Sequence, residues 1–255
     1  MIELAFEVGL NQLELMNYGD YYFFLAHLFK DPRYREFVFE KADQERVWML
    51  DNSAFELGES VDLSWLVSIA MDLPRLDVLV VSDKLGSSEE TIKKCKEFVV
   101  NEDVRYLVSQ RQPWLMVVAH SENNQVDELI SCLMVQKSLI KYHLNHSKIV
   151  FGLPRKYAGE TRIECAKRLS NLKQTKWIHF LGCPDLDDLR LIAFTLRSEV
   201  KPRCKFTLDT SLPWRLALED AGLQGETFEL EIPEVSFGER VEQISSVIGM
   251  GGEWE

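Results

Sequence analysis

The sequence predicts an α/β fold, a single (β/α)8 TIM-type barrel over residues 1–255 that ends in a short C-terminal extension. Three observations lead to this prediction. Eight short apolar runs recur between residues 2 and 209, segments with helical periodicity separate most of them, and apolar and polar residues hardly alternate within a run. Strands that are apolar throughout are typical of a parallel sheet buried on both faces, and eight strand–helix units predict a barrel.

The eight apolar runs are the predicted strands, and they are rich in Val, Leu, Ile and Phe. Each run leads to a small or polar residue, where a connecting loop can begin. The second run can also be interpreted as a helix. In chain order the runs are IELAFEVG (2–9), DYYFFLAH (20–27), RVWMLD (46–51), LDVLVVSD (76–83), PWLMVVAH (113–120), KIVFGLP (148–154), KWIHFLG (176–182) and CKFTLD (204–209).

The segments between the later runs have apolar residues at three- and four-residue spacings, which is typical of amphipathic helices. Several of them begin with acidic residues and end with basic ones, the charge order that the helix dipole favours. Two more helices and one extended stretch are predicted in the tail. The predicted helices are 88–100, 124–144, 159–172, 185–200, 214–221 and 237–248, and the extended stretch is FELEIP (228–233).

A doubly wound open sheet is the alternative fold for alternating strands and helices. Such a sheet usually has a glycine-rich phosphate-binding turn after its first strand. Here that turn reads EVGLNQ and contains one glycine, so the dinucleotide-binding pattern is absent. The barrel is therefore the favoured architecture.

The composition indicates a soluble globular protein, with 46% hydrophobic and 27% charged residues. No window approaches 18 apolar residues, and the stretch MIELAFEVGLNQ has neither a basic region nor a cleavage-like site, so we expect no membrane span and no secretory signal there. The five cysteines are widely spaced and form no C-x-x-C pair. Neither a disulfide framework nor a structural zinc site is expected, and a reducing cytoplasm fits best.

The net charge of −12 argues against a nucleic-acid partner, but the charge is unevenly distributed. Residues 91–205 carry 20 Lys and Arg against 12 Asp and Glu, whereas the rest of the chain carries 9 against 29. A basic central region can present a basic face to a polyanion, although scattered solvated charges would give the same count.

The C-terminal ends of barrel strands usually carry the functional groups. A single aspartate at such an end is equally well explained as a helix cap. Three aspartates and two histidines in such positions together favour a common site. The strand-end residues are Gly9, His27, Asp51, Asp83, His120, Gly152 with Leu153, Gly182 and Asp209.

The residue types at these ends favour chemistry performed by carboxylates. The His-x-His pair of metal-dependent hydrolase barrels, the G-x-S-x-G elbow and the P-loop are all absent from the sequence. His143 and His146 form only a weak i, i+3 metal motif. Two aspartates across a pocket can divide nucleophilic attack from acid/base work, as in retaining glycosyl transfer.

The segments around two of these aspartates resemble the tRNA-guanine transglycosylase superfamily. In that family a barrel strand ends in D-S-G-G-F-Q, whose aspartate is the general acid/base. Here Asp51-Asn-Ser-Ala-Phe55-Glu56 keeps D-x-x-x-F, with Glu in place of Gln. The family's nucleophile lies in D-x-x-x-P-x-R after the last strand, and Asp209-Thr-Ser-Leu-Pro213-Trp-Arg215 keeps that pattern.

Weaker matches occur in the same order along most of the chain. Asp83 corresponds to the aspartate with which the family reads the edge of the base. Val118-Ala119-His120 stands where the family has V-Q-G. Phe151-Gly152-Leu153 replaces a G-G/G-L turn, and His179-Phe180-Leu181-Gly182 resembles Y-L-M-G.

Two features differ from the tRNA-modifying members. No cysteine follows Cys204, so the C-x-C-x-x-C…H zinc insertion that supports tRNA docking and dimerisation is missing, and no zinc subdomain is expected. His120 replaces a glutamine, which changes how a base carbonyl would be held. The compact chain looks more like the phage and bacterial 7-deazaguanine DNA transglycosylases, which insert a 7-deazaguanine into DNA in exchange for guanine.

The resemblance implies a pentosyltransferase in which Asp209 attacks C1′ and Asp51 moves protons. The implied base-binding residues are Asp83, His120, Gly152, Leu153, Phe55 and Asn52. The implied nucleic-acid contacts are Arg155, Lys156 and Arg215, with Lys93, Lys94 and Arg162 as further candidates. Phe55 is either a stacking residue or a core residue, and Glu56 faces either the pocket or an arginine.

No metal and no cofactor are expected to take part. The expected partners are DNA and a 7-deazaguanine base such as preQ0, in the cytoplasm, or in the host cytoplasm if the chain is encoded by a phage. Three alternatives stay open: tRNA as the polymer, a non-catalytic deazapurine-binding barrel, and a carboxylate-based hydrolase of free nucleosides.

Overall fold

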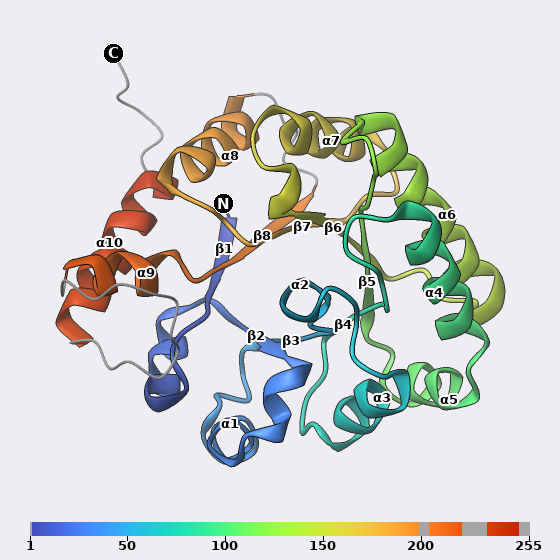
Figure 1. Ribbon diagram of the computed structural model, residues 1–255, viewed down its shortest axis with the longest axis horizontal. Coiled ribbons are helices and arrows are strands. Elements are labelled where there is room, and N and C mark those ends of the chain that lie inside the picture. Colours follow the sequence, from blue (N-terminus) through green and yellow to red (C-terminus); the bar gives the residue numbers. More distant parts are fainter. Residues whose placement is uncertain (1, 199–203, 221–233, 250–255) are drawn as a thin grey trace.

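Eight parallel strands form one sheet that curls into a nearly closed barrel, and helices surround it on the outside (Figure 1). The strand order is β1-β8-β7-β6-β5-β4-β3-β2, which leaves β1 and β2 side by side where the sheet closes. The computed structural model describes residues 2–198, 204–220 and 234–249. The predicted (β/α)8 architecture is confirmed.

All eight apolar runs form strands, including the second run, whose interpretation was ambiguous. That strand stops at Leu25, so His27 lies in the short 3-10 helix that follows it. The strands are β1 (Ile2–Phe6), β2 (Tyr21–Leu25), β3 (Val47–Asp51), β4 (Val78–Val80), β5 (Trp114–Val118), β6 (Ile149–Pro154), β7 (Trp177–Leu181) and β8 (Lys205–Thr210).

The six predicted helices are present, and the structure adds α1, α2, α3 and α5, which the periodicity did not predict. The extended stretch predicted at 228–233 lies outside the described residues. The helices are α1 (Pro32–Glu36), α2 (Ala54–Leu57), α3 (Leu63–Asp72), α4 (Ser88–Val100), α5 (Glu102–Arg111), α6 (Val126–Leu144), α7 (Glu160–Asn171), α8 (Leu186–Ser198), α9 (Leu212–Asp220) and α10 (Glu234–Gly249). The 3-10 segments are η1 (Leu10–Tyr18), η2 (Ala26–Lys30) and η4 (Arg155–Tyr157), and η3 (Phe37–Lys41) is a π-helical turn.

Side chains along each strand alternate between the barrel interior and the layer beneath the helices, as the period of two requires. In β7, Ile178 and Phe180 belong to the outer core, whereas Trp177 belongs to the inner one. His179 also faces inward, because its ring contacts inner-core aromatic residues of β2. The inner core consists of Ala5, Tyr21, Phe23, Leu25, Met49, Val78, Val80, Met116, Val118, Val150 and Trp177.

Asp20 bridges the seam between β1 and β2. Its backbone N–H donates to the carbonyl of Leu4 at 2.6 Å, and its carboxylate Oδ2 accepts from the Leu4 N–H at 2.8 Å. Gly19 allows the close approach, because a Cβ there would lie 3.1–3.2 Å from backbone atoms of Leu4, Ala5 and Tyr21. The Asp20 side chain thus accepts, between β1 and β2, a hydrogen bond that a backbone carbonyl of the neighbouring strand accepts elsewhere in the barrel.

The C-terminal helix α10 covers the outside of this region. Phe237 packs edge-on against Phe6, with 6.1 Å between ring centroids, and against Tyr18 at 5.6 Å. The hydroxyl of Tyr18 also donates to the Glu234 carboxylate at 3.0 Å. Helix α10 of the predicted C-terminal extension is therefore packed on the barrel wall next to β1.

No helix within the described ranges combines the length and the apolar character that crossing a membrane requires. All five cysteines are free thiols, and Cys204 is the one among them that is not buried.

Replacing Asp20 tests the seam. Asp20→Ala should lower the free energy of unfolding by about 1–3 kcal/mol, because the buried Leu4 N–H loses a charged acceptor. Urea unfolding followed by circular dichroism measures this change. The control is Asp72→Ala, an exposed aspartate of α3, which should change the stability by less than about 0.5 kcal/mol. Equal losses in the two variants would contradict the bridging role.

Candidate functional site

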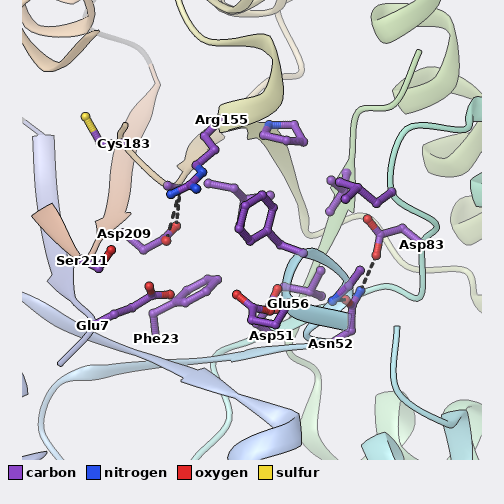
Figure 2. A pocket seen from close by; sticks show the side chains of 18 of the residues that line it. Glu7, Phe23, Asp51, Asn52, Glu56, Asp83, Arg155, Cys183, Asp209 and Ser211 are labelled. Carbon is purple, nitrogen blue, oxygen red and sulfur yellow. Dashed lines mark hydrogen bonds between the residues drawn. The ribbon is translucent and has the colours of Figure 1, made fainter. Parts of the chain in front are cut away.

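A pocket of about 350 Å³ lies at the C-terminal ends of the strands. Figure 2 shows acidic side chains from several strands directed toward this hollow. The two arginines in its lining are Arg155 and Arg215. The five carboxylates in its lining are Glu7, Asp51, Glu56, Asp83 and Asp209. The three aspartates that the sequence analysis expected to converge do share one pocket.

Asp209, near the end of β8, has two hydrogen-bond donors around its carboxylate. The ring Nε2 of His179 lies 2.8 Å from Oδ1, and the backbone N–H of Gly182 donates to both oxygens at 3.2 Å. Gly182 has a φ of +70°, and a Cβ there would lie 2.9 Å from the Arg155 side chain. The glycine therefore allows both the turn that aims its N–H at Asp209 and the close packing of Arg155.

Asp51 ends β3 and is 8% exposed. Its Oδ2 accepts from the N–H of Ser53 at 2.6 Å, which closes a tight turn. Ser53 has a φ of 61°, in the left-handed region that glycine adopts most readily, and its hydroxyl accepts from the His27 N–H. The aspartate thus both turns the chain and lines the pocket.

The environment of Asp51 favours its protonated form. Burial raises the pKa of Asp51 well above its usual range, and the negative charges of Glu56 and Asp83 raise it further. The hydrogen bond from Ser53 opposes this shift, and the charge of Asp209 adds to it. The environment of Asp51 therefore stabilises the carboxylic acid relative to the carboxylate.

Asp83 belongs to a closed hydrogen-bond network. Asn52 Nδ2 donates to Oδ1 at 2.8 Å and to the Val81 carbonyl at 2.7 Å, and His120 Nε2 lies 2.6 Å from Oδ2. His120 Nδ1 accepts from the Gly86 N–H at 3.2 Å, so its proton is on Nε2 and is donated to Asp83. Both ring nitrogens of His120 are thus bonded within the protein.

Glu7 is a pocket residue that the sequence analysis missed. Burial raises the pKa of Glu7 well above its usual range, the charges of Asp209, Glu56 and Asp51 add to this shift, and Arg155 opposes it. The first predicted run extends to Gly9, whereas β1 stops at Phe6. The alternation of outward Leu4 and Phe6 with inward Ala5 was the signal that could have identified Glu7.

The short helix α2 carries three pocket residues, Ala54, Phe55 and Glu56, over the barrel mouth (Figure 1). Glu56 is exposed on one side and lies against the pocket wall on the other. The loss of solvent on the pocket side raises the pKa of Glu56 to about 6. The negative charge of Asp209 raises this pKa further, and the positive charge of Arg155 lowers it. The Arg155 guanidinium stacks over the Phe55 ring at 4.6 Å from its centroid. Glu56 thus faces the pocket with an arginine nearby, and Phe55 is a half-exposed rim residue.

Of the predicted basic residues Arg215 and Lys156, the first lines the pocket and the second does not. Arg215 lines it and donates to the carbonyls of Cys183 and Pro184 at 3.3 and 2.7 Å. Lys156 is exposed outside the lining, with its ammonium 5.6 Å from the centre of the Tyr157 ring.

Two residues of the β6 strand end do not line the pocket. Leu153 is buried in the outer core, because side chains alternate along β6 and Leu153 points to the opposite side from the inward Val150. Gly152 faces inward below the pocket, where a Cβ would lie 3.1 Å from Leu181 and 3.2 Å from Met116.

The prediction that Arg162 contacts a phosphate is wrong. Its side chain is fully buried, and it pairs with Asp188 and donates to the Gly182 carbonyl at 2.8 Å. Its helix position on the inner face of α7 turns it toward the barrel instead of the solvent. Arg162 therefore supports the loop that carries Gly182.

The chain matches no family model, and no curated protein matches it. In the part of the chain that the structure describes, no group of three or more His, Cys, Asp and Glu side chains is arranged to hold a metal ion. The site contains two kinds of carboxyl group. Asp209 and Asp83 each accept hydrogen bonds from two donor groups, whereas burial favours the protonated forms of Asp51 and Glu7. That division suits a nucleophile and a general acid in one pocket.

Glu56→Gln should stabilise the protein at neutral pH. Between the usual value of 4.5 and about 6, the folded state binds more protons at Glu56 than the unfolded state, so stability falls as pH rises through this range. After allowance for solvent screening, the variant should gain up to about 1 kcal/mol at pH 7.5 and nothing at pH 4.

Urea unfolding at the two pH values measures this gain. The control is Glu97→Gln, an exposed residue of α4 outside the pocket, which should change the unfolding free energy by less than about 0.5 kcal/mol. A gain for Glu56→Gln that is the same at pH 4 and pH 7.5 would show that desolvation of the charged carboxylate is not its cause.

Proposed function

We propose that the protein is a base-exchange transglycosylase that replaces guanine in DNA with a 7-deazaguanine through a covalent aspartyl-glycosyl intermediate. The observation that carries this proposal is that Asp209 and Asp51 line one pocket in opposite environments. Asp209 receives hydrogen bonds that favour a carboxylate, and burial favours the protonated form of Asp51. The ordered motif resemblance supplies the substrate class.

Asp209 is the nucleophile in this proposal. Oδ1 accepts from both His179 and Gly182, whereas Oδ2 accepts from Gly182 and, having two lone pairs, retains one for attack. Oδ2 forms a bond to C1′ of a guanosine nucleotide as the C1′–N9 bond breaks. The electron pair of that bond leaves with guanine.

Asp51 moves the protons. The departing guanine takes the proton of the Asp51 carboxylic acid, which leaves a carboxylate. The incoming 7-deazaguanine gives its ring N–H proton to that carboxylate, and its ring nitrogen then displaces Asp209 from C1′. The raised pKa of Asp51 supports this role, because a proton must be present at the start of each cycle.

The remaining carboxylates suit the charge that develops during the reaction. Glycosyl transfer passes through an oxocarbenium-like transition state with positive charge at C1′. Negative charge on ionised carboxylates of this lining stabilises the positive charge at C1′.

Asp83 is the proposed partner of the N–H groups of the base. Its carboxylate is fixed by Asn52 and His120, and each oxygen retains a lone pair for a guanine-like edge. Because both His120 nitrogens are bonded within the protein, His120 acts on the base through Asp83 in this arrangement. The Phe55 ring, on which Arg155 stacks, lines the pocket and is the proposed stacking partner of the base.

DNA is the proposed polymer because the zinc insertion of the tRNA-modifying members is missing from the sequence. Arg155 and Arg215 at the pocket and Lys156 beside it are positioned to contact phosphates. A base in a duplex must leave the stack before C1′ can be reached, so single-stranded or flipped DNA is the expected form.

Base exchange is tested with DNA, tRNA and a 7-deazaguanine base in parallel reactions. Mass spectrometry of the digested polymers measures incorporation, and a denaturing gel detects the protein–DNA adduct. Asp209→Asn should abolish the adduct and lower exchange by at least about 1,000-fold, and Asp51→Asn should lower it by about 100- to 10,000-fold.

The control is Asp103→Asn, an exposed aspartate of α5 that does not line the pocket, which should stay within about twofold of the wild type. Incorporation into tRNA alone would replace DNA as the polymer. Release of base without incorporation would indicate a hydrolase, and binding of base without any adduct would indicate a non-catalytic barrel. Full activity in Asp209→Asn would overturn the assignment of the nucleophile.

A further inference from the structure

A chain of hydrogen bonds runs beneath the pocket and ends at Asp209. Trp177 Nε1 donates to the Thr207 hydroxyl at 2.8 Å, that hydroxyl lies 2.7 Å from His179 Nδ1, and His179 Nε2 lies 2.8 Å from Asp209 Oδ1. All four side chains are buried, with His179 and Thr207 at 0% exposure. They come from inward positions of the paired strands β7 and β8.

For a neutral His179 ring, the chain has one consistent direction when Asp209 is ionised. The indole N–H of Trp177 is a donor only, so the Thr207 oxygen accepts from it and keeps its own proton to donate. That proton goes to His179 Nδ1, which leaves the imidazole proton on Nε2, where it is donated to Asp209. The opposite tautomer would place a bare nitrogen lone pair against the carboxylate.

Packing holds the imidazole ring in this orientation. The Phe23 ring is stacked on it with 5.3 Å between centroids and 11° between planes. Tyr21 meets it edge-on at 6.2 Å. The ring is thus held by β2 on its faces and by β8 at its two nitrogens, and it does not line the pocket.

We propose that His179 is a positioning residue for the nucleophile, with its tautomer set by Thr207 and Trp177. Its Nε2 donates the hydrogen bond that fixes Oδ1 of Asp209 at the pocket wall. Oδ2 is thereby left to attack. The inference rests on the proposed function for its catalytic consequence, but the hydrogen-bond chain is a property of the free protein.

Kinetics of three variants test the catalytic consequence. His179→Phe keeps a ring but removes the donor, and kcat for base exchange should fall about 10- to 100-fold with KM unchanged within about twofold. The acid limb of its kcat–pH profile should move to higher pH, because the carboxylate of Asp209 loses a hydrogen-bond donor. His179→Gln keeps an N–H donor and should recover most of the loss, and Thr207→Val should lower kcat about three- to tenfold.

The matched control is His146→Phe. His146 is also a buried imidazole, and its Nε2 lies 2.8 Å from the Pro113 carbonyl at the amino-terminal end of β5, away from the pocket. This variant should leave the acid limb of the profile in place. An acid limb that moves equally in His146→Phe and His179→Phe, or does not move in His179→Phe, would overturn the positioning role.

Nitrogen NMR of labelled histidine in the substrate-free protein tests the chain without any activity. The wild type should show His179 protonated on Nε2, and Thr207→Val should change the Nδ1 shift. A ring protonated on Nδ1 alone would overturn the inference. If the wild type shows the Nε2 tautomer and no base exchange with any polymer, the proposed function fails while the hydrogen-bond chain stands.

Discussion

Repulsion among five carboxyl groups in a pocket of about 350 Å³ is the constraint on which the arrangement of this site depends. Two unit charges 5 Å apart repel by about 3 kcal/mol at an effective dielectric constant of 20. The groups cannot all be ionised at little cost, so donors and protons decide which of them carry charge. Asp209 and Asp83 each receive a histidine and a second donor, whereas burial raises the pKa of Glu7 and Asp51.

The scaffold determines which carboxylates receive these donors. The two histidines belong to the strand or strand end that neighbours their aspartate, so the pairing of β7 with β8 and of β4 with β5 brings them together. Local backbone geometry supplies the rest. Gly182, with its positive φ, aims an N–H at Asp209, and the left-handed turn at Ser53 uses one oxygen of Asp51.

The pocket residues and the apolar core residues occupy different positions along the strands. The outer row of the strands packs its apolar side chains beneath the helices, and the inner row carries Asp51 and Asp209 at its last positions, with polar side chains such as His179 beneath them. The buried pair of Arg162 and Asp188 supports the loop at the end of β7, and Asp20 and α10 hold the region of β1 from which Glu7 projects. The free-energy cost of desolvating the carboxylates is thus offset by the burial of apolar side chains in the surrounding core.

The sequence by itself determined the eight strands, the barrel and the convergence of Asp51, Asp83 and Asp209, because apolar runs and their ends are local features that a closed parallel sheet brings to one mouth. Only the tertiary structure decided which side chains face that mouth. A shift of one residue reverses the direction of a side chain in a strand, so Glu7 was missed and Leu153 was misplaced. The partnership of His179 with Asp209 joins residues 30 positions apart, and it depends on strand register, which no local pattern specifies.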